Sequence, residues 1–343
     1  MSYLGDILEQ PAVLRAIVEA YQEHPFWQTL QTKMAAKRYH KIVLTGMGSS
    51  YYALFPAWLC LNQQRLPAIH IEASELIHYG LEMLDEYTLV VVVSQSGESI
   101  EIRRLVEAVK GKVTLISLTN TENNFLADHS DFALFTQAGS EVPVATKTYT
   151  GCLALLHLLT QSLIEQLQPQ TYVDLIQLSD RMASLLENWT QWLDPVVQPL
   201  QSVNFYTLLG RGPAVASAMT GALILKEAAR LNAVGLSGGQ FRHGPMEALS
   251  PAMGVILFAN PGQTSSLSCQ LAADIHQRGG EVVLVGAPEA PAGVGNLALP
   301  RVDESLSPIL EILAVQLLAA RLAAEKGIVP GEFRWSGKVI KAE

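Results

Sequence analysis

A run of apolar residues ends in a serine-rich loop at LVVVVSQSGES, residues Leu89–Ser99. Five consecutive apolar residues are typical of a strand buried on both faces, and the serines and glycine that follow are typical of a turn. Beyond the loop, apolar residues recur at Ile102, Leu105, Val106 and Val109, which is the spacing of an amphipathic helix. The segment therefore predicts a buried strand, a polar loop and a helix in direct succession.

Similar units lie on both sides of this segment. Short apolar runs occupy residues 42–44, 113–116 and 132–135, and each leads into glycine, serine or threonine. Alternation of short buried strands with helices is typical of a parallel sheet covered by helices. We therefore predict the α/β class with a doubly wound parallel sheet.

The second half of the chain repeats the pattern at a nearly constant distance. Gly46 and Gly210 are 164 residues apart, and Gly97 and Gly262 are 165 apart. The repeated apolar runs occupy residues 205–209, 255–258, 282–285 and 297–299. This near-constant distance predicts two tandem α/β domains related by internal duplication.

The duplication also suggests where the domains begin and end. Val113 and Val282 are 169 residues apart, which places about one extra helical turn between Thr264 and Val282. We expect four parts: a helical segment over residues 1–40, a first α/β domain over 41–194, a second over 195–329, and a tail over 330–343.

Composition restricts the function classes. The chain of 343 residues is 49% hydrophobic and 16% charged, as expected of a protein with a large core. It carries 32 acidic and 23 basic residues, a net charge of −9, which argues against general binding to nucleic acid or to an anionic membrane. The first residues lack the pattern of a signal peptide, and the apolar helix expected over 152–164 is shorter than a membrane span of ~20 residues. We expect a cytoplasmic protein.

The cysteines indicate neither a disulfide framework nor a metal site. Cys60, Cys152 and Cys269 lie far apart, and no CxxC or HExxH pattern occurs. We expect each cysteine to be a small buried hydrophobe, and we expect no metal.

The loop Ser94-Gln95-Ser96-Gly97-Glu98-Ser99 is the first candidate site. It lies at the start of a helix, where unpaired N–H groups and a partial positive charge favour an anion. Helix capping alone also favours serine, but three serines and a glutamine exceed what capping requires. We expect Ser94, Gln95, Ser96 and Ser99 to bind a phosphate group.

A second loop, Gly46-Met47-Gly48-Ser49-Ser50, follows the preceding strand. It resembles the opening of a dinucleotide-binding fingerprint but lacks the third glycine, so a nucleotide-binding oxidoreductase stays as one alternative. Ser49 and Ser50 fit better as further donors to phosphate or hydroxyl groups. The duplicate, Gly210-Arg211-Gly212-Pro213, has no serine. The phosphate site is therefore expected in the first half only.

Two ionisable groups in the second half are candidates for acid–base chemistry. His243 precedes Gly244-Pro245, in irregular backbone, and its ordinary pKa near 6.5 suits proton transfer near neutrality. A structural turn histidine is the other interpretation. Glu227 follows Lys226 within an apolar helical stretch, where an exposed ion pair is the simpler interpretation.

In combination these motifs resemble the sugar isomerase (SIS) domain family, with two domains in tandem, and above all the isomerase half of glucosamine-6-phosphate synthase. The resemblance covers nearly the whole chain. The matched stretches are Gly46–Tyr51, Glu72–Glu75, Ser94–Ser99, Ala145–Thr150, which includes Thr146 and Lys147, Leu225–Glu227 and Arg242–Pro245.

The resemblance implies roles for individual residues. Ser50, Ser94, Gln95, Ser96 and Ser99 would bind the sugar phosphate, with Ser49, Thr146 and Lys147 expected beside them. Glu227 would move a proton between C1 and C2. His243 would act in ring opening from a partner subunit, which implies a homodimer or a dimer of such dimers. Lys338, in a tail reaching the active site, would engage the substrate carbonyl.

Departures from the synthase pattern indicate a different reaction. Thr220 and Ile224 stand where the synthase has Glu and Lys, Gln240 stands where relatives usually have Glu, and no glutaminase domain precedes the isomerase in this sequence. We expect a ketosamine-phosphate deglycase or an aminosugar-phosphate deaminase that requires no cofactor. A non-catalytic sugar-phosphate sensor is the alternative, since it would need the serine loop but neither Glu227 nor His243.

Overall fold

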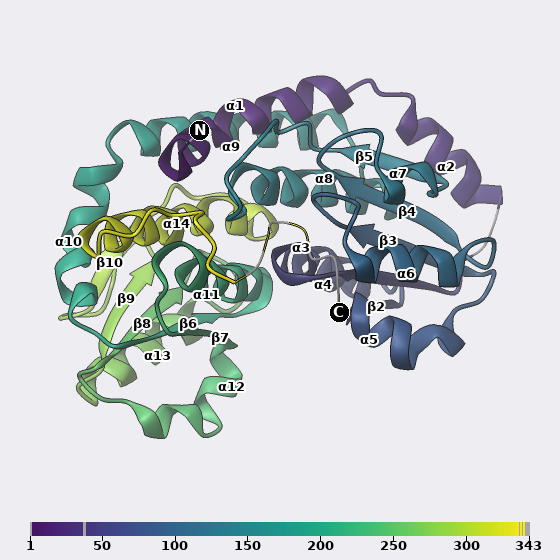
Figure 1. Ribbon diagram of the computed structural model, residues 1–343. Coiled ribbons are helices and arrows are strands. Elements are labelled where there is room, and N and C mark those ends of the chain that lie inside the picture. Colours follow the sequence, from purple (N-terminus) through teal and green to yellow (C-terminus); the bar gives the residue numbers. More distant parts are fainter. Residues whose placement is uncertain (1, 37–38, 336, 338, 340–343) are drawn as a thin grey trace. The chain divides into compact units, whose positions relative to one another are not determined.

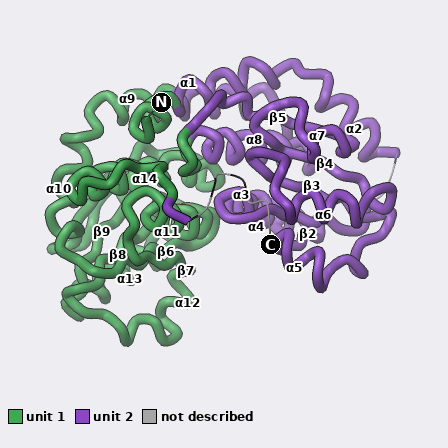
Figure 2. Tube along the Cα trace, in the orientation of Figure 1, with its two compact units in different colours: residues 1–9, 142–146, 180–333 green, residues 10–141, 147–179, 334–343 purple. Residues whose placement is uncertain are grey.

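The computed structural model describes residues 2–36, 39–335, 337 and 339. The chain forms two compact units, drawn in different colours in Figure 2. Unit 1 comprises residues 1–9, 142–146 and 180–333, and unit 2 comprises residues 10–141, 147–179 and 334–343. Each unit therefore combines separate stretches of chain.

Unit 2 is built on a five-stranded, fully parallel sheet with the order β2-β1-β3-β4-β5 (Figure 1). This is a doubly wound order, in which the strand sequence reverses direction between β1 and β3. Its strands are β1 (Lys41–Gly46), β2 (Ala68–Glu72), β3 (Thr88–Val93), β4 (Thr114–Thr119) and β5 (Phe132–Phe135).

Helices cover the strands of unit 2. Every residue of β3 is buried, as the continuous apolar run predicts. Val90 and Val92 pack in one cluster with Ile102 and Leu105 of α6. The helices of this unit include α2 (Phe26–Ala36), α3 (Gly48–Ala53), α4 (Phe55–Gln63), α6 (Ile100–Val109), α7 (Phe125–Asp128) and α8 (Lys147–Leu163), and α1 (Tyr3–Tyr21) and α9 (Pro169–Glu187) each contribute part of their length.

Unit 1 contains a second five-stranded parallel sheet, with the order β10-β9-β8-β6-β7. Matched to the first sheet, β6 takes the place of β1, β7 of β2 and β8 of β3, so the predicted duplication is confirmed in the strand order. Its strands are β6 (Phe205–Gly210), β7 (Ala233–Ser237), β8 (Met253–Phe258), β9 (Glu281–Val285) and β10 (Gly295–Leu297).

Strand register corrects one distance in the predicted repeat. Val90 pairs with Leu115 in unit 2, and Val255 pairs with Val282 in unit 1. The equivalent of Val282 is therefore Leu115, 167 residues earlier, and not Val113. An apolar run locates a strand, but its register is fixed only by the pairing.

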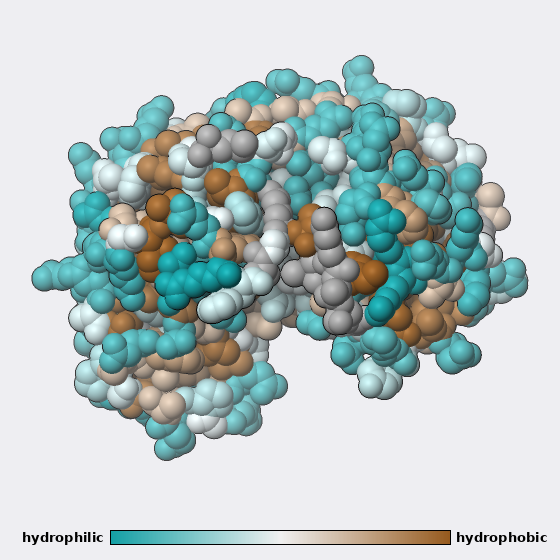
Figure 3. Space-filling view, in the orientation of Figure 1, coloured by the Kyte–Doolittle hydropathy of each residue, from teal (hydrophilic) through white to brown (hydrophobic). Residues whose placement is uncertain are grey.

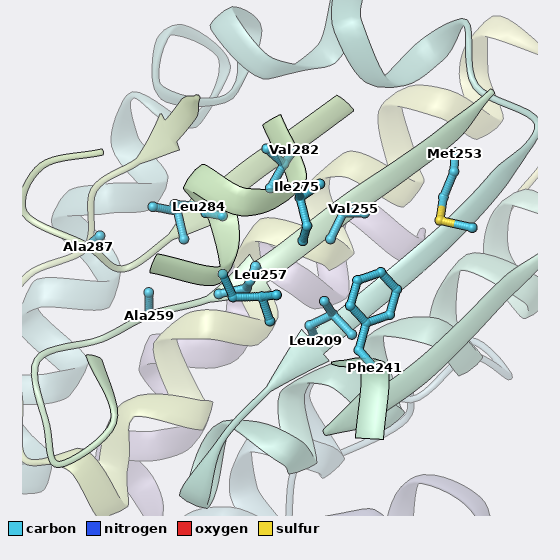
Figure 4. Close-up of a cluster of buried hydrophobic side chains, with 12 residues drawn as sticks. Leu209, Phe241, Met253, Val255, Leu257, Ala259, Ile275, Val282, Leu284 and Ala287 are labelled. Carbon is cyan, nitrogen blue, oxygen red and sulfur yellow. The ribbon is translucent and has the colours of Figure 1, made fainter. Parts of the chain in front are cut away.

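The core of unit 1 lies between this sheet and its helices. Figure 4 shows one cluster, in which Val255 and Leu257 of β8 pack with Phe241 of α12 and Ile275 of α13. α14 is apolar and long enough to cross a membrane, but 89% of its most apolar window is buried within the structure, as in the core helix of a globular domain. The helices of this unit include α10 (Trp189–Gln201), α11 (Val215–Ala229), α12 (Gly238–Arg242), α13 (Ser265–Gln277) and α14 (Ser307–Glu325).

Two predicted features of the sheets differ in the structure. Two of the four edge strands, β2 and β7, do not form apolar runs, because most of their residues are only half-buried. The run at 297–299 contributes only Leu297 to β10. Residue 194, the expected end of the first domain, lies inside α10, and the compact units divide within α9, between residues 179 and 180. The expected domain bounds stay a prediction.

Exposed side chains fit the predicted globular character. On the face drawn in Figure 3, hydrophilic residues form most of the surface, and hydrophobic residues lie between them in small groups. Of the three cysteines, Cys152 is buried as expected, and burial raises the pKa of its thiol. Cys60 and Cys269 are only half-buried, which corrects the expectation for those two.

Candidate functional site

In unit 2, both serine loops follow neighbouring strands of the sheet. Gly46 ends β1 and pairs with Val93, the last residue of β3. The approach is so close that a Cβ on Gly46 would lie 2.7 Å from the carbonyl oxygen of Val93. The loops therefore start side by side at the carboxyl ends of β1 and β3, the point of reversal where doubly wound sheets bind ligands. Ser49 and Ser50 occupy the first turn of α3.

The loop after β3 is folded around its own hydroxyl groups. The Gly97 N–H donates to Ser94 Oγ at 3.1 Å, and the Glu98 N–H donates to Ser96 Oγ at 3.2 Å. Ser99 is the N-cap residue of α6, and its side chain makes no capping hydrogen bond. Hydrogen bonds within the loop thus engage Ser94 and Ser96, and no serine side chain caps α6. Ser96 and Ser99 are half-exposed at the helix start.

The loop conformation depends on Gly97 and Asn124. Gly97 has a φ of +66°, and a Cβ there would lie 1.9 Å from Asn124 Oδ1. Asn124 is held in turn by Nδ2 bonds to Thr119 Oγ1 at 3.1 Å and to the Thr121 carbonyl at 2.6 Å. The sequence analysis missed Asn124, although its place shortly after the third apolar run, at the start of α7, was the available signal. Asn124 positions the loop that would hold the anion.

A carboxylate also braces this loop. Glu98 Oε1 accepts from the Phe125 N–H at 2.8 Å, and its other oxygen pairs with Arg103. The Phe125 hydrogen bond is the main reason that the pKa of Glu98 lies below its usual range. Glu98 is therefore ionised and already paired, so its role is structural.

Thr146 and Lys147 are both buried. Lys147 is the first residue of α8, which packs against α3 within unit 2. Their predicted role beside the phosphate stays a prediction.

In unit 1, Glu227 lies near the end of α11. It follows the buried residues Thr220 and Ile224 at helical spacing, so one stripe of the helix carries all three. Burial raises the pKa of the Glu227 carboxyl to about 7, against a smaller lowering by Lys226. A carboxyl group that titrates near neutrality is suited to general acid–base catalysis, and it differs from the exposed ion pair that the sequence alone favoured.

His243 caps the end of α12. Its backbone N–H donates to the Gln240 carbonyl at 3.0 Å, and the residue is exposed. No hydrogen bond joins His243 to Glu227 within the described part of the chain. Lys338 lies outside the described residues. Among the residues that are described, no group of three or more His, Cys, Asp or Glu side chains could hold a metal ion.

Comparison with known proteins agrees with this arrangement. The SIS domain model matches residues 36–162 and 202–326, which correspond to the two parallel sheets.

The chain belongs to the SIS domain family.

Its relatives include the glutamine–fructose-6-phosphate aminotransferase (isomerizing) of Pyrococcus horikoshii, which is 32% identical over 99% of this chain. The match covers 57% of that protein, so this chain spans a little over half the length of the relative.

Solved structures with the same fold support the SIS assignment. The C-terminal domain of glucosamine-fructose-6-phosphate aminotransferase from Francisella tularensis has a TM-score of 0.83 at 22% identity and covers 95% of this chain and 97% of its own. A glucosamine-6-phosphate deaminase from Thermotoga maritima has a TM-score of 0.77 at 19% identity, with both chains covered completely. At these identities the similarity establishes the tandem SIS fold.

Proposed function

We propose that this chain is an enzyme that transfers a proton between C1 and C2 of a 6-phosphorylated ketosamine or aminosugar and releases an amine. The observation that carries the proposal is the half-buried Glu227 carboxyl, whose pKa is raised to about 7 by burial. A sugar-phosphate sensor has no need of a carboxyl group tuned in this way. The names of the relatives, an isomerizing aminotransferase and a glucosamine-6-phosphate deaminase, support a phosphorylated aminosugar as the substrate class.

The same proton transfer serves both candidate substrates. With a ketosamine phosphate, the Glu227 carboxylate takes a proton from C1, and an enaminol forms as the C2 carbonyl gains a proton. Return of the proton to C2 gives an imine at C1, which water hydrolyses to an amine and an aldose phosphate. With a 2-amino aldose phosphate, the proton moves from C2 to C1, and hydrolysis of the C2 imine gives ammonia and a ketose phosphate. Each route consumes one water molecule and requires no redox step.

The serine loop would supply the binding energy. A bound phosphate could accept from the N–H groups at the start of α6, while Ser96 and Ser99 turn their hydroxyls to donate. Contacts to the phosphate are remote from the reacting carbons, so they can hold the sugar in place for proton transfer.

His243 is proposed to open the sugar ring in a substrate held by a second copy of the chain. His243 is exposed at the end of α12, so its imidazole is accessible to another molecule. Inactive Glu227→Gln and His243→Ala proteins, mixed under conditions of confirmed subunit exchange, should then recover part of the activity. Failure to recover any activity would assign both residues to one chain.

The experiment that tests the proposal is a substrate panel. We expect amine release from at least one 6-phosphorylated ketosamine or aminosugar, and no release from the same compounds without phosphate. Binding of the phosphorylated compounds without turnover would identify a sensor instead. Borohydride reduction during turnover tests whether Lys338 engages the substrate carbonyl. A trapped adduct between protein and substrate that is lost in Lys338→Ala would show that it does.

A further inference from the structure

Unit 1 has a loop at the same position in its sheet as the serine loop of unit 2, but this loop lacks the hydroxyl groups of Ser94 and Ser96, and its glycine does not share the positive φ of Gly97. The segment Ala259–Thr264 joins β8 to α13, as Ser94–Ser99 joins β3 to α6, and the two segments are 165 residues apart. Gly262 matches Gly97, and Thr264 matches Ser99 as the N-cap residue. Ser94 and Ser96 are replaced by Ala259 and Pro261, which cannot donate through their side chains.

A carboxylate of the chain itself lies on this loop. Glu304, in the short helix before α14, accepts from the Gln263 N–H through Oε2 at 3.2 Å. A Cβ on Gly262 would lie 2.2 Å from its Cδ, and a Cβ on Gly212 would lie 3.6 Å from its Oε1. Because Gly212 follows β6 and Gly262 follows β8, the carboxylate sits at the point of reversal in this sheet.

Polar groups around the carboxylate are only partly satisfied. A cavity of about 10 Å³, roughly the room of one water molecule, is lined by Arg211, Asn260, Glu304 and Glu311 among others. Asn260 is 9% exposed and its Oδ1 has no hydrogen-bond partner among the described residues, and neither has the buried Arg211 Nε. The two atoms offer one acceptor and one donor, which matches a hydrogen phosphate ion with both O–H and O⁻ groups.

A second carboxyl group, that of Glu311, lines the same cavity and is held by hydrogen bonds within the chain. Glu311 is fully buried and accepts from Asn260 Nδ2 at 2.6 Å and from Ser307 Oγ at 3.0 Å. Burial raises the pKa of Glu311, while its hydrogen bonds from Ser217, Asn260 and Ser307 act in the opposite direction.

We infer that Glu304 is an internal anion occupying a second oxyanion site in unit 1, at the place where unit 2 presents its serine loop. Removal of this carboxylate opens the site to a phosphate-sized oxyanion, with Arg211 and the Gln263 N–H as donors. The intact chain therefore keeps unit 1 from competing for phosphorylated ligands. This inference concerns unit 1 alone and does not depend on the proposed enzymatic activity.

Calorimetric titration with inorganic phosphate tests the inference. Glu304→Ala should bind one more phosphate per chain than the wild type, and its Tm should rise by roughly 5 to 10 °C at a phosphate concentration 100 times Kd. Glu289→Ala is the matched control, because it removes one exposed carboxylate elsewhere in unit 1 and should bind no additional phosphate. Adding Arg211→Ala to Glu304→Ala should abolish the gained site.

Two outcomes would overturn the inference. One is equal phosphate stoichiometry for Glu304→Ala, Glu289→Ala and the wild type. The other concerns the case in which Glu304→Ala does not fold in phosphate-free buffer. We then expect it to refold in phosphate but not in chloride of the same ionic strength. Failure to refold in both would show that Glu304 is only a structural brace.

Discussion

Replacement of Glu227 by glutamine should change how the stability of the protein depends on pH. The pKa of a free glutamate side chain is 4.5, and burial in α11 raises that of Glu227 to about 7. Each pKa unit corresponds to 1.36 kcal/mol, so ionisation of Glu227 costs the folded state about 3 kcal/mol above neutral pH. Below pH 4.5 the group is protonated in both states, and the cost disappears.

The sign follows from proton binding. Between pH 4.5 and 7 the folded state holds more protons at this site than the unfolded state, so the stability of the wild type falls as pH rises through that window. Glu227→Gln lacks the titration. Relative to the wild type, we expect it to gain up to about 3 kcal/mol between pH 5 and 8.

Urea unfolding at pH 5, 6, 7 and 8 measures this difference. Glu289→Gln is the control, since this exposed glutamate lies in the same unit and its replacement should give a curve parallel to that of the wild type. A constant difference between Glu227→Gln and the wild type across this range would refute the burial argument, and with it the case for a base tuned to neutrality.

Two further predictions concern the serine loop of unit 2. Combined Ser96→Ala and Ser99→Ala should weaken sugar-phosphate binding by about 1–3 kcal/mol, the worth of hydrogen bonds to a charged group, and unchanged affinity in calorimetry would remove the phosphate assignment. Gly97→Ala should destabilise the protein and lower phosphate affinity, because the new Cβ would meet Asn124. Gly111→Ala is the control: Gly111 has a φ of +71° and open space around it, so the substitution should cost only the strain of a positive φ. Equal losses of stability in the two glycine variants, with phosphate affinity intact, would show that the contact with Asn124 does not shape the loop.

Much of the architecture could be predicted because buried parallel strands are continuous apolar runs. Leu89–Val93 and its counterpart in β8 are buried along their whole length, and their apolar runs are visible in the sequence without any partner strand. The edge strands β2 and β7 mix polar with apolar residues and are mostly half-buried, so the same criterion does not detect them. The register of β9 depended on its pairing with β8, which no local pattern encodes.

The candidate site was predictable to a smaller extent. Hydroxyl groups at the start of a helix can be recognised from the residue types alone, and in the structure Ser94–Ser99 lies at the carboxyl end of β3, as predicted. The environment of a single carboxyl group cannot be recognised in this way. In the sequence, Lys226-Glu227 has the form of a surface ion pair, and only the burial of Glu227 in the structure gives its pKa near 7. Glu304 lies 41 residues after Gln263, from whose N–H it accepts a hydrogen bond, and only the fold creates this contact.

Exchange of substrate protons with deuterated solvent tests the central claim most directly, namely that Glu227 moves a proton between C1 and C2 of a phosphorylated sugar. With a substrate identified by the amine-release panel, mass spectrometry or NMR follows deuterium at these two carbons for the wild type and for Glu227→Gln, with substrate affinity measured in parallel. We predict that exchange falls at least ~100-fold in the variant while binding changes little, because glutamine keeps the shape of glutamate but cannot accept the proton. Exchange at the wild-type rate in Glu227→Gln would contradict the account.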